Sequence, residues 1–321
     1  MPSARSQHGQ TTVEWIGLVA CLSVLLVAVL AAAGTAVPGA SLARAIAAKI
    51  VCALELGETC ATEPDLVAAY GVEIAELVRD HAPWVFYEEG MTALPVDYRD
   101  CRESACSVGE RLGPVTETDA GLPVTAFVHV VDCRDPSEAQ AGIDCSGPRA
   151  GNLYLQYWFF YVDSATLEGE GLQKEAMARL GRPGFHPDDW ESYQLRIGPD
   201  GADARAGSHH GYNYEGGARN WASDAGMKDV NDAVEDIGLR SDGGWGRETG
   251  VTWVSGGSHA GHVKDDPAAR LVQGDYQRWT TPEGLTLIPL EPIAAEDADA
   301  EFAIVAPWLK EVWGDAEFDS G

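Results

Sequence analysis

The sequence predicts a mostly β protein: a β-sandwich outer domain with a few peripheral helices, preceded by one N-terminal transmembrane helix. Three observations support this fold class. Short alternating or apolar runs separated by turn residues fill the middle of the chain, which is typical of strands. The 321 residues include 36 glycines and 10 tryptophans, which suit a loop-rich β protein with aromatic packing. An uncharged run over 15–38 stands apart near the N-terminus.

The uncharged run is long enough to cross a bilayer as a helix and too long for a simple cleavable signal core. Residues 1–14 precede it as a short polar leader in which Gly9, Gln10 and Glu14 stand just before the run. This arrangement resembles the class III signal of Flp-type pilins and TadE-like pseudopilins. The resemblance implies that a prepilin peptidase cuts after Gly9 and that Glu14 pairs with a neighbouring pilin-like subunit. An ordinary signal anchor is the alternative.

The cysteines indicate on which side of the membrane the remainder lies. One of the seven falls inside the uncharged run, and six follow it in three close pairs. An even number of closely spaced cysteines is typical of disulfides in an oxidising compartment, so we expect the C-terminal domain outside the cell. Nearest-neighbour pairing is preferred because short loops close easily; the expected pairs are Cys52 with Cys60, Cys101 with Cys106, and Cys133 with Cys145. A zinc site at 101–106 is the weaker alternative because no second tight pair accompanies it.

Residues 39–80 are predicted to be a helical stalk. The segment 40–56 is rich in alanine and amphipathic. A second helix is expected over 64–80, with Pro64 and Asp65 in its first turn.

The main domain is expected over 81–293. A strand is predicted at 124–131, where His129 is interpreted as a packed or surface residue. The nearly continuous apolar and aromatic run 152–163 predicts a buried central strand. Asp163 at its end is more typical of a turn cap than of a ligand.

One short motif offers the most chemistry. Residues 185–191 place His186, Asp189 and Glu191 close together, directly before an alternating run at 190–197 that predicts a strand. Period-two geometry sends Asp189 and Glu191 to one face and Trp190 to the other. Carboxylates and an imidazole at a strand mouth suit a divalent cation or a general acid and base. Ordinary turn chemistry is the alternative interpretation.

Two later histidines are candidates for the same site. The turn 198–201 predicts a hairpin that returns His209 to the neighbourhood of the motif. A strand at 251–255 leads into a glycine-rich stretch with His259, and His262 is a weaker candidate. No G-x-S-x-G pattern surrounds the serine there, so a catalytic serine is not indicated.

Four stretches together resemble the Vps62-like family, over about residues 80–292. They are Ala82-Pro83-Trp84-Val85-Phe86-Tyr87, Tyr157-Trp158-Phe159-Phe160-Tyr161, the His-x-x-Asp-Trp-Glu motif at 186–191, and Gly257-Ser258-His259-Ala260. The motif spacing is also similar to that of necrosis-inducing (NPP1-type) proteins. That similarity implies a β-sandwich in which His186, Asp189 and Glu191 help to bind a divalent metal. A further upstream aspartate of those proteins has no clear counterpart here.

The charge balance excludes one class of partner. The chain carries 22 Lys+Arg against 50 Asp+Glu, a formal net charge of −28. Such an acidic surface repels nucleic acid, so no nucleic-acid partner is expected. Residues 294–321 are predicted to be an acidic tail. An amphipathic helix is expected at 307–313, with one side formed by Trp308, Leu309, Val312 and Trp313.

These features predict a single-pass protein of the cell membrane with an extracellular domain. The first functional hypothesis is a metal-dependent binding or adhesion module associated with a pilus-like assembly. The second is a metal-dependent extracellular hydrolase that uses His186, Asp189 and Glu191. The third is a structural subunit of the assembly. Carboxylate ligands favour Ca²⁺ or Mg²⁺, and added imidazoles would favour Zn²⁺ or Mn²⁺.

Overall fold

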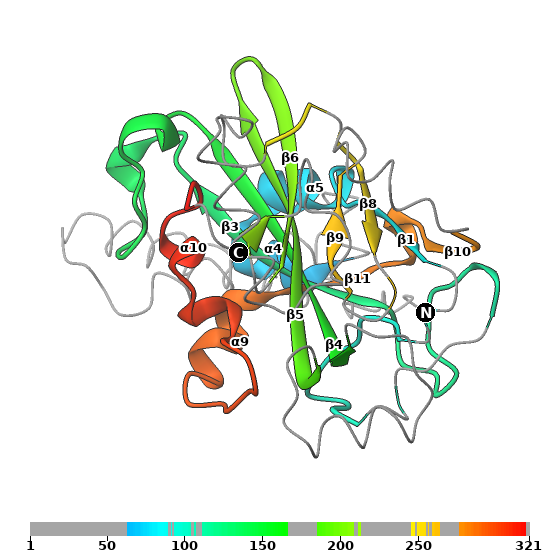
Figure 1. The fold of residues 1–321 in the computed structure, drawn as a ribbon. Coiled ribbons are helices and arrows are strands. Elements are labelled where there is room, and N and C mark those ends of the chain that lie inside the picture. The colour runs from blue at the N-terminus through cyan, green and yellow to red at the C-terminus, as the bar shows by residue number, and fades with distance from the viewer. Residues whose placement is uncertain are drawn as a thin grey trace, which may run out of the picture. The chain divides into compact units, whose positions relative to one another are not determined.

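The protein is seen here in a computed structural model (Figure 1). It describes residues 63–88, 91, 93–103, 106, 111–165, 185–208, 211–212, 245–247, 249–254, 256, 259–263 and 276–318. The chain divides into two compact units, Met1–Ala75 and Glu76–Gly321. The described strands all belong to the second unit, which is mostly β, with two sheets and a few short helices. The predicted mostly β class is confirmed.

Two sheets contain these strands. The five-stranded sheet has the order β2-β10-β1-β8-β9 and the six-stranded sheet the order β11-β3-β4-β5-β6-β7. The strands of the first are β1 (Trp84–Tyr87), β2 (Gly113–Pro114), β8 (Val251–Val254), β9 (Gly261–His262) and β10 (Arg278–Thr280). Those of the second are β3 (Thr125–Asp132), β4 (Leu153–Ala165), β5 (Phe185–Gly198), β6 (Gly201–Ser208), β7 (Gly211–Tyr212) and β11 (Thr286–Pro289).

The long strand β4 lies in the interior of the six-stranded sheet, between β3 and β5, and pairs antiparallel with both. Its residues from Leu153 to Ser164 are buried. A strand covered on both faces has no solvent-facing positions, which explains why its sequence is nearly continuously apolar rather than alternating. The predicted central strand at 152–163 is confirmed.

The motif at 185–191 lies inside a strand and not in a loop before one, so the expected strand start at Trp190 was wrong by five residues. β5 begins at Phe185 because the far end of β4 supplies backbone partners, with Ser164 opposite His186 and Asp163 opposite Pro187. β6 pairs with β5 only from Ser192 to Gly198. Among the described strands, the first half of β5 is therefore an edge of the sheet on the side away from β4. An edge position tolerates a proline such as Pro187, which cannot donate a backbone hydrogen bond.

The hairpin predicted at 198–201 is confirmed. Gly198 pairs with Gly201, and β6 returns antiparallel along β5. Gly201 has a φ of 120°, a conformation that favours glycine.

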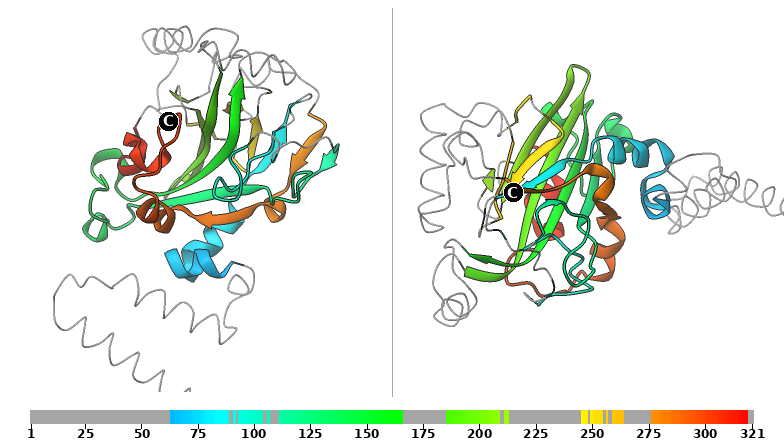
Figure 2. Two further views of the ribbon diagram at one scale, coloured as in Figure 1. Left: turned by 90° about the horizontal axis from the view of Figure 1, so that it is seen from below. Right: turned by 90° about the vertical axis from the view of Figure 1, so that its right-hand side faces the viewer.

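The six-stranded sheet has β8 and β9 on one side and the helices α9 (Leu290–Glu296) and α10 (Glu311–Gly314) on the other (Figure 2). On the β9 side the approach is close. A Cβ built on Gly261 would lie 3.2 Å from the Cβ of Ala206 and 3.1 Å from Oγ1 of Thr252. Glycine at this position lets β9 lie close to β6 and β5.

The other face of the sheet holds the C-terminal segment through a row of polar side chains. His129, Gln156, Gln194 and Arg205 lie opposite one another on four successive strands. Three of them bind backbone carbonyls of residues 312–316. These hydrogen bonds join Gln156 Nε2 to Val312 O (3.1 Å), His129 Nε2 to Trp313 O (3.1 Å) and Arg205 Nη2 to Ala316 O (2.7 Å). The His129 ring also stacks on Trp313 at 3.5 Å between centroids, so its predicted packing role is confirmed.

The C-terminal elements differ from the single amphipathic helix expected at 307–313. A 3-10 helix η5 (Pro307–Leu309) is followed by the short α10, and Lys310 between them has an extended backbone. Val312 is buried, but Leu309 is 62 % exposed. The expected one-sided stripe fails because the backbone changes direction at Lys310. The helix α9 was not predicted; it buries Leu290 and Ile293.

The predicted helix at 64–80 is two helices, α4 (Pro64–Tyr70) and α5 (Val72–Asp80). Pro64 stands in the first turn of α4, as expected. The break falls at Gly71, whose φ of 82° cannot continue a right-handed helix.

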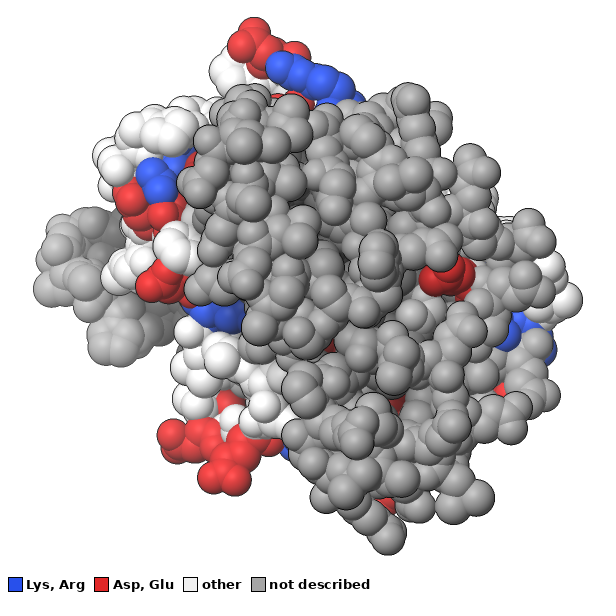
Figure 3. Space-filling model, viewed as in Figure 1, with Lys and Arg blue, Asp and Glu red and all other residues white. Residues whose placement is uncertain are grey.

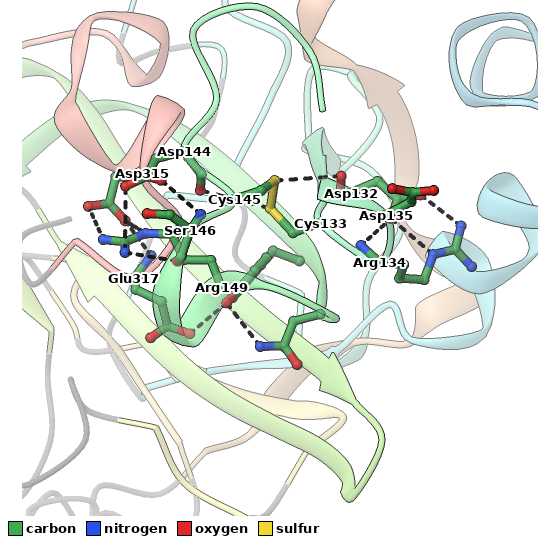
Figure 4. The surroundings of a disulfide bond; sticks show 12 residues. Asp132, Cys133, Arg134, Asp135, Asp144, Cys145, Ser146, Arg149, Asp315 and Glu317 are labelled. Carbon is green, nitrogen blue, oxygen red and sulfur yellow. Dashed lines mark hydrogen bonds and ion pairs between the residues drawn. A yellow bond between two sulfur atoms is a disulfide. The ribbon is translucent and has the colours of Figure 1, made fainter. Parts of the chain in front are cut away.

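Two of the three expected disulfides are confirmed: Cys101–Cys106 and Cys133–Cys145. The second lies beside two Arg–Asp ion pairs, Arg134 with Asp132 and Arg149 with Asp315 (Figure 4). The Arg149–Asp315 ion pair connects the C-terminal segment to the loop that follows the Cys133–Cys145 disulfide. Cys52 and Cys60 lie outside the described residues.

The predicted leader at 1–14 with Gly9, Gln10 and Glu14, and the predicted span at 15–38, also lie outside the described residues. Within the described ranges no helix is long and apolar enough to cross a membrane.

On the face shown in Figure 3, acidic side chains gather over the region of α9.

Candidate functional site

Successive motif residues on β5 point to opposite faces of the sheet, as the period-two argument predicted. Trp190 belongs to the hydrophobic cluster on the face that carries the C-terminal segment, where it meets Phe127 and Phe160 edge-on. Asp189 and Glu191 belong to the opposite face, toward β9. Both carboxylates are buried, with 1 % and 4 % of their residue surfaces exposed.

His259 reaches Asp189 from the loop between β8 and β9. Its Nδ1 lies 3.1 Å from Oδ2 of Asp189, and both side chains are 2 % exposed. The imidazole also stacks on the ring of Tyr161, with centroids 4.2 Å apart and planes 11° from parallel. Tyr161 is the β4 residue paired with Asp189, so the sheet itself positions both groups that contact His259. The φ of His259 is 57°, a left-handed conformation uncommon outside glycine.

The contact with Asp189 determines which nitrogen of His259 carries a proton. A carboxylate oxygen accepts, so Nδ1 donates, and in the neutral ring Nε2 has the lone pair. A carboxylate that holds a histidine in this way is the usual outer partner of a metal-binding or proton-accepting imidazole.

Glu191 is the least compensated group of the site. Burial raises its pKa well above the usual range, and the neighbouring charge of Asp189 raises it further. The cation of Lys310 and the hydrogen bond from the Gly261 N–H act in the opposite direction. Its Oε2 is buried and has no hydrogen-bond partner among the described residues. The protonated form of Glu191 therefore persists to a higher pH than that of an ordinary glutamate.

Lys310 is the cation whose charge acts on this pair of carboxylates. Burial lowers its pKa to about 8, although the charges of Glu191 and Asp189 raise it. The Nζ atom lies 5.2 Å from the ring centroid of Trp158, on the opposite face of the sheet from Glu191.

The five predicted ligands thus fall into two groups. The structure brings Asp189 and His259 into contact, and Glu191 lies two residues from Asp189 on the same face of β5. His186 is described only through its backbone in β5, and His209 lies outside the described residues. No group of three or more His, Cys, Asp and Glu side chains in the described part of the chain is arranged to hold a metal ion. The weaker candidate His262 is buried in β9, where it pairs with Trp253.

Asp188 is the third carboxylate of the motif, and it has a structural role. Asp188 lies on the Trp190 face, where it accepts two hydrogen bonds from Arg102 at 3.0 and 2.5 Å and one from the Ala303 N–H at 2.9 Å. These bonds explain its φ of 56°, and they make it a structural residue.

Sequence reasoning missed Tyr161 and Lys310. Tyr161 stood in an aromatic run that pointed to packing alone. Lys310 could have been noticed as a single cation among tryptophans and aliphatic residues at 307–313.

Comparisons of the chain with protein-family models, with curated proteins and with solved structures gave no match.

Proposed function

We propose that this chain is a membrane-anchored cell-surface binding module of β-sandwich architecture, in which Glu191 binds a divalent cation beside the Asp189–His259 pair, together with the further predicted ligands His186 and His209. The supporting observation is the buried Oε2 of Glu191, which lacks a partner among the described residues although a second buried carboxylate lies nearby. Two carboxylates cannot both ionise in an apolar environment without compensation. A divalent cation supplies that compensation and replaces the proton on Glu191.

The donor types suit such an ion, although the described side chains by themselves form no group of three arranged to hold a metal. Carboxylate oxygens such as those on β5 are common ligands of divalent cations. A metal-binding imidazole commonly donates a hydrogen bond from its other nitrogen to a carboxylate, as His259 does to Asp189. The backbone of His186 lies in the same strand, five residues before Glu191. Oxygen ligands alone favour Ca²⁺ or Mg²⁺, whereas His259 and His186 together would favour Zn²⁺ or Mn²⁺.

Elemental analysis of the detergent-solubilised full chain tests this proposal. We expect about one divalent ion per chain in the wild type and much less in the Glu191→Gln and His186→Ala variants. The Glu296→Gln variant is the matched control, since it makes the same chemical change at an exposed position. Equal metal content in all four proteins would refute the cation site.

Membrane attachment forms a second part of the proposal. The uncharged run at 15–38 anchors the chain, and prepilin peptidase cleaves after Gly9, so that pilin-like subunits become partners. The two disulfides in the described residues support an extracellular location for the domain. Mass spectrometry of the N-terminus tests processing: the wild type should begin at Gln10, and a Gly9→Leu variant should keep its leader. An intact leader in both proteins would favour an ordinary signal anchor.

A metal-dependent extracellular hydrolase is the alternative. The Asp189–His259 hydrogen bond favours it, because it orients the imidazole as such bonds do in enzymes that transfer protons. A bound ion would supply an activated water, while Glu191 would act as the base. Under this alternative, Glu191→Ala abolishes turnover of an ester substrate. Activity unchanged by that substitution would exclude this use of Glu191.

A further inference from the structure

Three buried nitrogen atoms on the C-terminal side of the six-stranded sheet have no acceptor among the described residues. They are Nε1 of Trp190, Nε1 of Trp308 and Nζ of Lys310, and none has a hydrogen-bond partner among the described residues. An indole N–H and a lysine ammonium only donate, so each of them requires an acceptor. A buried donor left without one costs about 1–3 kcal/mol, and more when it is charged.

The three groups belong to one neighbourhood. The rings of Trp190 and Trp308 meet edge-on, with centroids 6.2 Å apart. Lys310 follows Trp308 by two residues, and its backbone N–H donates to Pro307 O in the same turn. Its Nζ lies over Trp158. Trp158 and Trp190 stand on the paired strands β4 and β5, opposite Ser192 and Phe160 respectively, so they are diagonal neighbours on one face.

A third tryptophan of the same cluster, Trp158, does have an acceptor for its indole N–H. Nε1 of Trp158 donates to Oε1 of Gln156 at 3.2 Å, although that ring is as deeply buried as Trp190. The other residues that line the cluster are mostly aliphatic or aromatic, with Phe302 in edge-on contact with both Trp190 and Trp308. An apolar lining with a few polar groups is typical of a small-molecule site.

The charges determine which ligand suits these donors. Lys310 is the one cation among the three, and with a pKa of about 8 it is mostly charged at neutral pH. One positive charge compensates one negative charge. A dianion such as phosphate would bring excess negative charge close to Asp189 and Glu191, whose charges already act on Lys310. A carboxylate has one charge and two oxygens with about four acceptor positions, enough for all three donors.

We propose that Trp190, Trp308 and Lys310 form a binding site for a small monocarboxylate, held between the β4–β5 face and residues 307–310. This site is distinct from the proposed cation site because Trp190 lies on the face of β5 opposite Asp189 and Glu191, although the charges of those carboxylates act on Lys310.

Acetate is the probe, and acetamide is its neutral counterpart of the same shape. The detergent-solubilised full chain, labelled with 5-fluorotryptophan, is titrated with each by fluorine NMR, and the Trp190 and Trp308 signals are assigned from Trp→Phe variants. We expect acetate to shift both signals saturably and acetamide to leave them in place. Lys310→Met keeps the length of the apolar side chain and should reduce acetate affinity at least tenfold.

Arg134→Met is the control, because it removes a cation from an exposed ion pair on the same domain. It should retain wild-type acetate binding. Thermal unfolding checks the fold of each variant. Because Lys310→Met also removes the charge that acts on Glu191 and Asp189, its acetate binding is measured well below its own unfolding temperature. An absence of saturable shifts, an equal response to acetamide, or unchanged binding in a folded Lys310→Met protein would each overturn the proposal.

Discussion

Replacing Glu191 by glutamine should stabilise the protein at neutral pH once divalent cations are removed. In a chelating buffer the wild-type carboxyl is buried beside Asp189, and its Oε2 has no partner among the described residues. Glutamine is nearly isosteric and stays neutral, so it avoids the energetic cost of burying a charge or of taking up a proton at neutral pH.

The magnitude follows from burial. Because Glu191 is only 4 % exposed, solvent screens its charge little, and the cost of an uncompensated buried group is about 1–3 kcal/mol. For a domain of this size each kcal/mol corresponds to about 2–4 °C in unfolding temperature. The Glu191→Gln variant should therefore unfold roughly 2–12 °C above the chelated wild type.

The pH dependence identifies the cause. A raised pKa means that the folded state keeps its proton while the unfolded chain releases it, so wild-type stability falls as pH rises from about 4.5, the ordinary value, toward the folded pKa. Below that window both states are protonated and the two proteins should be equally stable. The gap should open by up to about 1.4 kcal/mol per pH unit. A carboxylate stabilised by an ion pair would give the opposite pH dependence, because the folded protein would become more stable as the pH rises.

Thermal unfolding followed by tryptophan fluorescence between pH 4 and pH 8 measures the gap, with Glu296→Gln as the exposed control. Addition of Ca²⁺ or Zn²⁺ should then stabilise the wild type selectively. The reasoning is refuted if Glu191→Gln is the less stable protein in chelator, or if the difference does not change with pH.

Three further substitutions test how the domain is held together. Replacing Cys133 and Cys145 by serine should lower the free energy of unfolding by about 3 kcal/mol, since the bridge closes a loop with a sequence separation of 12; unchanged urea unfolding would contradict this. Arg205→Met should cost about 2–3 kcal/mol and speed proteolysis of the C-terminal segment, because the guanidinium holds a backbone carbonyl there at 2.7 Å; an unaltered cleavage rate would argue against that anchor. Asp188→Asn should cost about 1–2 kcal/mol by removing the charge that faces Arg102, and Asp188→Ala more, because alanine tolerates a φ of 56° poorly; equal melting of the two variants would count against the backbone argument.

Some of this structure follows from local pattern. The hairpin at 198–201 was predictable because turn residues restrict the backbone over four positions. The opposite faces of Trp190 and Glu191 follow from the period of a strand and need no knowledge of the rest of the fold. The two described disulfides join neighbours in sequence, where short loops close at low entropic cost.

Local patterns were therefore sufficient to predict the mostly β class, the face on which each motif residue lies, and the short-range links. The contact of His259 with the carboxylate of Asp189, 70 residues earlier, arises from the tertiary fold, as does the approach of Lys310 to Glu191 through the sheet. It also decided that the motif is a strand, because β4 supplies the partners from far along the chain. Contacts at such separations depend on which strands pair and how the sheets pack, and no local periodicity encodes that choice.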